Sequence, residues 1–175
     1  MGLAIAAAAA SAGCPCTLLM GPATLDPSDA GSGIRVARFR TTADLEAALA
    51  EHWPEHDVLV MAAAVADYRP AASASGDAAA GGKLRRREGP LVLELESTPD
   101  LLAGVAARSR PGQTLVGFAL EPPDRLLASA RDKLVRKGVH AIVANPLETM
   151  DGQDGSPITG LTNGTDAVNL GPSFP

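Results

Sequence analysis

The chain has 175 residues, of which 46% are hydrophobic and only 3% aromatic, and its formal net charge is −5. This length suffices for one domain with a sizeable core, and few aromatic rings are present to stack on single-stranded nucleic acid. The acidic balance argues against a DNA-binding surface. We therefore expect no nucleic-acid partner. No segment has the apolar length of a membrane-spanning helix, so we also expect no membrane partner.

The first thirteen residues are rich in alanine and superficially resemble a signal peptide. No Lys or Arg precedes the apolar run, so the positive region of such a signal is missing. Alanine favours helix, and Gly13 stands where a helix would end, which predicts a buried helix over residues 2–12. Cys14 and Cys16 follow without histidines at ligand spacing. We therefore expect no metal site held by these residues and a reduced, cytoplasmic protein.

Strand and helix patterns then alternate along the chain. Thr41 with Asp44 three residues later predicts a capping box that opens a helix of about ten residues. Thr98-Pro99-Asp100 predicts a second helix start, with Thr98 as N-cap and proline in the first turn. A further helix is expected at 123–137. Strands are expected at residues 15–20, 34–39, 57–63, 91–96, 114–119 and 140–145.

This alternation predicts an α/β fold with a Rossmann-like, doubly wound, mainly parallel sheet between two layers of helices. Residues 1–175 are expected to form a single domain. Two stretches lie outside the regular order. Residues 70–87 begin with small residues and glycines, which predicts a flexible flap, and residues 147–175 are rich in turn residues, with a hairpin signal at Asn163-Gly164.

Polar residues follow the predicted strands. Small residues and then Asp67 come after the strand at 57–63, Thr98 follows the strand at 91–96, and Glu121 and Asn145 follow the last two strands. Ligands of open α/β sheets bind beyond the carboxyl ends of the strands. We therefore expect these strand ends to line one ligand-binding crevice.

Cations occur in two short clusters that could reach such a crevice. Lys83 begins a run of basic residues at the far end of the flap, and Lys133 and Lys137 are four residues apart on one helix. Cations from separate elements suit a triphosphate. Each cluster also has a simpler interpretation, as a solvated charge run or as cations that stabilise a helix C-terminus.

Taken together, these segments resemble phosphopantothenoylcysteine synthetase, also called phosphopantothenate–cysteine ligase, the C-terminal half of a bacterial bifunctional protein. The resemblance extends over about residues 1–170 in the family's order. It rests most on the Ala-Ala-Val-Ala-Asp-Tyr-Arg string at 63–69. The other matching segments are Gly21-Pro22, Lys83-Leu84-Arg85-Arg86, Thr98-Pro99-Asp100-Leu101-Leu102, Gly117-Phe118-Ala119, Glu121, Lys133, Lys137 and Ala144-Asn145.

The resemblance implies a CTP- and Mg²⁺-dependent ligation of cysteine to 4′-phosphopantothenate through an acyl-cytidylate, in coenzyme A biosynthesis. It implies that Lys83 is catalytic and contacts the reacting phosphate. It also implies a homodimer, and FMN only where a separate flavin decarboxylase half exists. The positions expected to hold the nucleotide are Ala62, Ala63, Asp67, Thr98, Pro99, Asp100, Leu101, Phe118, Lys133 and Lys137, and those expected to contact the substrate are Ala64 and Arg69.

The resemblance also implies that a front segment is missing. Family members carry a first central strand, a glycine-rich turn and an Asn-x-Ser-Ser-Gly segment before the Met-Gly seen here as Met1-Gly2. Loss of a central strand would leave buried backbone groups unpaired, at about 1–3 kcal/mol each, against a total stability of about 5–15 kcal/mol. We therefore expect an incomplete synthetase domain that is marginally stable or prone to aggregate.

Two other functions stay open at this point. The chain is also consistent with a fragment that binds nucleotide, or completes a partner chain, without turnover. A dinucleotide-binding oxidoreductase domain is a further alternative, although the chain has no Gly-x-Gly-x-x-Gly fingerprint.

Overall fold

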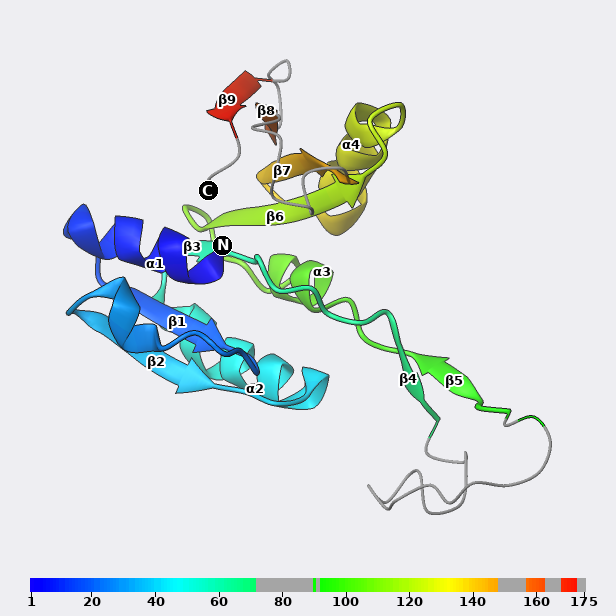
Figure 1. The fold of residues 1–175 in the computed structure, drawn as a ribbon, viewed down its shortest axis with the longest axis horizontal. Coiled ribbons are helices and arrows are strands. Elements are labelled where there is room, and N and C mark those ends of the chain that lie inside the picture. The colour runs from blue at the N-terminus through cyan, green and yellow to red at the C-terminus, as the bar shows by residue number, and fades with distance from the viewer. Residues whose placement is uncertain (72–89, 91, 148–156, 163–167, 173–175) are drawn as a thin grey trace. The chain divides into compact units, whose positions relative to one another are not determined.

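The computed structural model describes residues 1–71, 90, 92–147, 157–162 and 168–172. The chain divides into two compact units (Figure 1). The first unit comprises residues Met1–Ala63 and Leu101–Pro175, and the second comprises Ala64–Asp100. The run Lys83-Leu84-Arg85-Arg86-Arg87 and the Asn163-Gly164 turn lie outside the described residues.

The first unit begins with the predicted alanine helix, α1 (Gly2–Ser11). Gly13 follows at φ 77°, a left-handed conformation that glycine adopts without strain, and so ends the helix as expected. The expectation that the helix is buried is wrong, because Ala6 is the one buried residue within α1. A helix of small, nearly uniform side chains has no large apolar stripe to bury.

A two-stranded parallel sheet follows α1, made of β1 (Cys16–Met20) and β2 (Ile34–Arg38). The short 3-10 helix η1 (Pro27–Ala30) lies between these strands in the sequence. Both strands occupy the segments expected from the sequence, with slightly tighter boundaries.

The helix α2 (Thr42–His52) confirms the predicted capping box. The Thr41 hydroxyl accepts from the Asp44 backbone N–H at 3.1 Å, and the Asp44 carboxylate accepts from the Thr41 N–H at 2.9 Å. The backbone N–H groups of Thr41 and Arg40 both donate to the Asp44 carboxylate and lower its pKa. The 3-10 helix η2 (Trp53–Glu55) then leads into β3.

The main sheet has five strands in the order β3-β6-β7-β8-β9. The strands β3 (Val58–Val60), β6 (Thr114–Glu121) and β7 (Ala141–Pro146) run parallel. The strands β8 (Pro157–Thr162) and β9 (Val168–Pro172) continue the sheet antiparallel. The antiparallel β8–β9 pair agrees with the hairpin expected around Asn163-Gly164.

Two helices connect the parallel strands, α3 (Leu101–Ala106) and α4 (Leu126–Lys137), and α4 contacts both β6 and β7. Gly117 in β6 allows close packing, because a Cβ there would lie 2.8 Å from Leu102 Cδ2 and 2.9 Å from Ile142 Cδ1. The core of this region includes side chains that are almost fully buried, among them Val105, Leu115, Ala130, Val139 and Ile142. The mixed α/β fold with a parallel core is therefore confirmed.

The second unit holds a short antiparallel ribbon of β4 (Tyr68–Pro70) and β5 (Leu95–Ser97). The prediction that residues 91–96 form a strand of the parallel sheet is wrong, because the strand begins at Leu95 and its partner among the described residues is β4, antiparallel. A period of two identifies a half-buried strand but does not identify its partner. The described residues thus form three separate sheets where one was expected.

Candidate functional site

The carboxyl ends of β6 and β7 lie side by side in the main sheet. Phe118 is half-buried in β6 opposite Val143, and Leu120 and Glu121 pair in register with Asn145 and Pro146. Parallel pairing places both strand ends at the same edge, which is the edge where ligands bind in open α/β sheets. The predicted convergence of Phe118, Glu121 and Asn145 is therefore present in the first unit.

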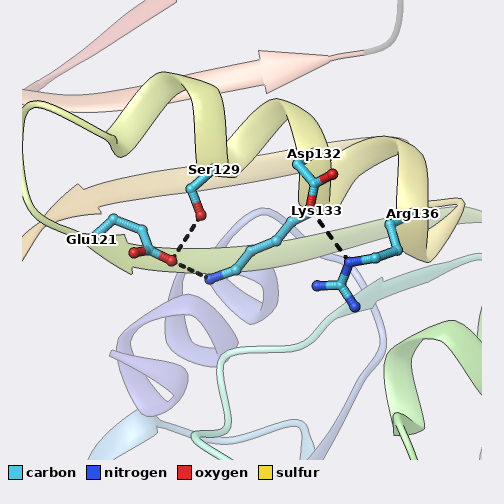
Figure 2. Close-up of polar contacts among 5 residues, drawn as sticks. All are labelled: Glu121, Ser129, Asp132, Lys133 and Arg136. Carbon is cyan, nitrogen blue, oxygen red and sulfur yellow. Dashed lines mark hydrogen bonds and ion pairs between the residues drawn. The ribbon is translucent and has the colours of Figure 1, made fainter.

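Glu121 organises a polar cluster at this edge (Figure 2). Its Oε1 accepts a hydrogen bond from Ser129 Oγ at 2.8 Å and one from Lys133 Nζ at 2.9 Å. The strand β6 supplies the carboxylate, and α4 supplies both donors. The Lys133 and Glu121 side chains are 25% and 26% exposed, so the ion pair is largely shielded from water.

The ionisation of Glu121 reflects these contacts. The hydrogen bond from Lys133 lowers the pKa of the Glu121 carboxyl most, and the hydrogen bond from Ser129 lowers it further, although partial burial opposes both. The carboxylate is therefore charged throughout the neutral range, and it remains an acceptor for the ammonium. Sequence reasoning identified both Glu121 and Lys133 but missed their contact and missed Ser129.

Two further polar residues belong to the same region of the first unit. The side-chain oxygen of Asn145 is buried and has no hydrogen-bond partner among the described residues. A buried acceptor without a donor is costly, so its presence at a strand end is typical of a ligand contact. Lys137, one turn beyond Lys133 on α4, is half-buried.

The second unit brings together two of the predicted segments. The Thr98 backbone N–H donates to the Asp67 carbonyl at 2.9 Å, and the Thr98 hydroxyl donates to the Ala66 carbonyl at 2.5 Å. The Asp67 side chain itself is exposed. Arg69 donates through Nε to Glu96 Oε1 at 2.7 Å across the ribbon.

These contacts correct two details of the sequence-based site. Thr98 is not the N-cap of a helix, because α3 begins at Leu101 and the Thr98 hydroxyl donates to the Ala66 carbonyl instead. Thr98 also does not follow a strand of the parallel sheet, because β5 belongs to the ribbon. The expected alignment of four parallel strand ends therefore holds for β3, β6 and β7 and is wrong for β5.

The remaining predicted site residues are spread over both units. Ala62 and Ala63 follow β3 in the first unit, where Leu101 is buried at the start of α3. Ala64, Pro99 and Asp100 belong to the second unit and are exposed. Lys83, the predicted catalytic residue, lies outside the described residues.

A groove that sequence reasoning did not find lies at the amino ends of β1 and β2. Its volume is about 360 Å³, and its lining includes Cys16, Arg35 and His56. Both His56 ring nitrogens are engaged, Nδ1 with the His52 carbonyl at 2.7 Å and Nε2 with Thr17 Oγ1 at 3.0 Å. Partial burial, and then the neighbouring Cys14, raise the pKa of the Cys16 thiol, which does not favour a reactive thiolate.

Two negative findings apply to the described part of the chain. No helix there is long and apolar enough to cross a membrane. No group of three or more His, Cys, Asp or Glu side chains among the described residues is arranged to hold a metal ion.

A family model described as DNA/pantothenate metabolism flavoprotein C-terminal domain matches residues 1–167. The coenzyme A biosynthesis bifunctional protein CoaBC of Mycobacterium tuberculosis (strain H37Rv) is 40% identical over 155 residues, covering 82% of this chain and 35% of that protein. A cysteine/cysteine sulfinic acid decarboxylase from an unknown prokaryotic organism is 38% identical over 148 residues, covering 85% of this chain and 39% of that protein. The chain spans less than two fifths of the length of these curated relatives.

Solved structures of the same kind of domain have a similar fold. A crystal structure of the C-terminal domain of the bifunctional protein CoaBC matches with a TM-score of 0.72 at 28% identity, covering 97% of this chain and 71% of that one. The DNA/pantothenate metabolism flavoprotein of Streptococcus pneumoniae matches with a TM-score of 0.77 at 22% identity, covering 96% and 80%. The second match supports the fold alone.

Proposed function

The chain belongs to the family of DNA/pantothenate metabolism flavoprotein C-terminal domains, and from this premise we propose that it carries out phosphopantothenate–cysteine ligation with CTP. The observation that carries the proposal is the polar cluster at the carboxyl ends of β6 and β7. There, Lys133 and the unpartnered Asn145 oxygen lie within the region that the family model covers. A cation and a free acceptor at this edge suit a nucleotide.

The proposed reaction has two steps. The carboxylate of 4′-phosphopantothenate attacks the α-phosphate of CTP, which forms the acyl-cytidylate and releases pyrophosphate. The cysteine amine then attacks the acyl carbon, loses a proton, forms the amide and releases CMP. Nucleotidyl transfer depends mainly on positioning and on stabilisation of negative charge, which the ammonium groups of Lys133 and Lys137 would supply.

The residues divide into three groups by proposed role. Lys83 contacts the reacting phosphate, and Ala64 and Arg69 contact the substrate. Asn145, already expected at a strand end, joins the nucleotide-binding group, because its buried side-chain oxygen can accept from a ligand N–H or O–H. The residues proposed to hold the nucleotide are those expected from the resemblance: Ala62, Ala63, Asp67, Thr98, Pro99, Asp100, Leu101, Phe118, Lys133 and Lys137.

Mg²⁺ fits this site as part of a metal–nucleotide complex. Among the described residues no carboxylate cluster forms a cage for it, and Mg²⁺ at nucleotide sites is commonly held by phosphate oxygens and waters. When bound, it would neutralise phosphate charge. We propose FMN only for a separate decarboxylase partner, if one exists. We also propose, from the resemblance, that the chain forms a homodimer and is cytoplasmic.

The doubly wound sheet is proposed to be completed by a strand from outside the described residues. β1 pairs only with β2 and β3 pairs only with β6, so each has one edge without a partner strand among the described residues. A parallel strand inserted between β1 and β3 would join the two sheets into one. It would also satisfy backbone groups that are otherwise left to solvent.

The completing strand is tested by hydrogen exchange on this chain and on a version extended upstream in the same reading frame. We expect the β1 and β3 amides that do not bond to β2 or β6 to exchange quickly in the 175-residue chain and to become protected in the extended one. Equal exchange in the two, or an upstream frame without an apolar strand and an Asn-x-Ser-Ser-Gly segment, would reject this part of the proposal.

The ligase activity is tested by CMP release from CTP. Release should require both cysteine and 4′-phosphopantothenate, and Lys83→Ala should slow it strongly. CMP release that is independent of cysteine, or an undiminished Lys83→Ala rate, contradicts the proposed reaction or the proposed role of Lys83, respectively.

The split sheet favours a second candidate, a fragment that binds nucleotide or completes a partner chain without turning over. Calorimetry separates the two functions: CTP binding without CMP release supports the fragment, and CTP binding with cysteine-dependent release supports the ligase.

A further inference from the structure

Glu121 accepts two hydrogen bonds at one oxygen, and this arrangement restricts both partners. Ser129 and Lys133 come from adjacent turns of α4, and both reach Oε1 of the last residue of β6. Ser129 thereby fixes the carboxylate, and the carboxylate fixes the ammonium. The Lys133 side chain therefore has fewer accessible rotamers than a solvent-exposed lysine has.

The ammonium retains capacity for a ligand. Lys133 has three N–H donors, and Glu121 is the one acceptor bonded to it among the described residues. Two donors therefore remain for oxygens of an anion at the carboxyl edge of the sheet. Partly buried ion pairs contribute little net stability, because desolvation offsets the attraction, so stability alone does not account for the pair.

We propose that Glu121 is a positioning residue that, held by Ser129, directs the Lys133 ammonium toward the phosphate groups of the nucleotide. This inference rests on the proposed function for the identity of the ligand. It assigns to Glu121 no contact with the reacting atoms. Its effect on the nucleotide passes through Lys133.

The same helix offers a matched control. Asp132 and Arg136 form an ion pair of the i,i+4 type at 3.5 Å, with side chains 72% and 57% exposed. Figure 2 shows this pair beside the Glu121 cluster, with no dashed line joining the two. Asp132→Asn removes a carboxylate from α4 but leaves the Lys133 contact intact.

The test is calorimetric titration of CTP with Mg²⁺ into the wild type and four variants. Glu121→Ala should weaken binding about tenfold, because the ligand must then order the Lys133 side chain that Glu121 no longer holds. Glu121→Gln should remain within about threefold of the wild type, because an amide oxygen can still accept from Ser129 and Lys133. Ser129→Ala should fall between them, and Asp132→Asn should match the wild type.

Several outcomes overturn the inference. If Glu121→Ala binds CTP as well as the wild type, or if it binds more tightly, the carboxylate does not position the lysine for the nucleotide. If Glu121→Gln loses as much affinity as Glu121→Ala, the charge of residue 121 matters and the geometry of the acceptor does not.

A second measurement separates this inference from the proposed function. Acetic anhydride labelling followed by mass spectrometry reports how accessible the Lys133 amine is, with or without a nucleotide. Lys133 should be acetylated several-fold faster in Glu121→Ala than in the wild type or Asp132→Asn, and equal rates would overturn the positioning. A wild type that binds no CTP but shows this difference in labelling would contradict the proposed function alone.

Discussion

The two units fix their polar side chains by different means. In the first unit, Glu121 and Lys133 extend from β6 and α4, whose neighbouring residues Leu115 and Ala130 are completely buried. In the second unit, Arg69 and Glu96 extend from strands of three residues each, and Tyr68 and Leu95 beside them are 62% and 57% exposed. The packed core therefore holds the first pair in place, whereas the second pair extends from a ribbon whose neighbouring side chains are largely exposed in the described part of the chain.

This contrast indicates how far the side chains of each unit are ordered before any ligand binds. A lysine fixed against a buried sheet is preorganised, so a ligand does not have to order it. Side chains on an exposed ribbon must still be ordered when a ligand binds.

The largest expected effect is on core packing. Leu115→Ala should lower the free energy of unfolding by about 2–5 kcal/mol, because it opens a cavity beneath the strand that carries the site. Leu95→Ala on the ribbon is the matched variant and should change the free energy of unfolding by less than about 0.5 kcal/mol. Chemical denaturation measures both, and equal losses would show that the ribbon is packed as firmly as the sheet.

The next effect concerns the shielded ion pair. Glu121→Ala should destabilise the chain by about 1–3 kcal/mol, because it leaves Lys133 and Ser129 partly buried without their acceptor. Thermal unfolding of Glu121→Ala and of the Asp132→Asn control measures the difference. An effect no larger than that of the control would mean that water replaces the carboxylate without loss of stability.

The same pair predicts a dependence on pH. Because the pKa of Glu121 is lower in the folded chain than its usual value, the carboxylate stabilises the fold above that usual value, near 4.3. The stabilisation is lost as pH falls through the lowered pKa. The difference in unfolding free energy between wild type and Glu121→Gln should therefore be largest at neutral pH and shrink below about pH 4.

The smallest expected effect is on the ribbon's ion pair. Arg69→Gln should change the free energy of unfolding by about 0–1 kcal/mol, because Arg69 and Glu96 are both well exposed to water. The same variant should nevertheless weaken binding of 4′-phosphopantothenate if Arg69 contacts the substrate. Denaturation and calorimetry on one preparation check both statements, and a large loss of stability would contradict the contrast between the units.

Local signals predicted much of the fold. Thr41 and Asp44 form the expected capping box, Gly13 ends α1, and the apolar periods locate β1, β2, β6 and β7. Each of these features depends on residues close together in the sequence. The alternation of strands and helices was likewise sufficient to predict the parallel core.

Features that depend on distant contacts were not predicted. The period-two pattern before Thr98 predicted a strand but did not predict that β4 is its antiparallel partner. The Thr98 hydroxyl donates to the Ala66 carbonyl and does not cap a helix. Glu121 and Lys133 are 12 residues apart and meet only because α4 folds back along β6. The residue types of the candidate site were visible in the sequence, but their pairing depended on the tertiary structure.

The most direct test of the central claim is residue-resolved NMR of the chain during titration with CTP and Mg²⁺. We expect the largest shifts on residues at the carboxyl ends of β6 and β7 and on the adjoining α4, namely Phe118, Glu121, Lys133 and Asn145. Shifts confined to the groove around Arg35 and His56, or no saturable shift in the β6–α4 region, would contradict it.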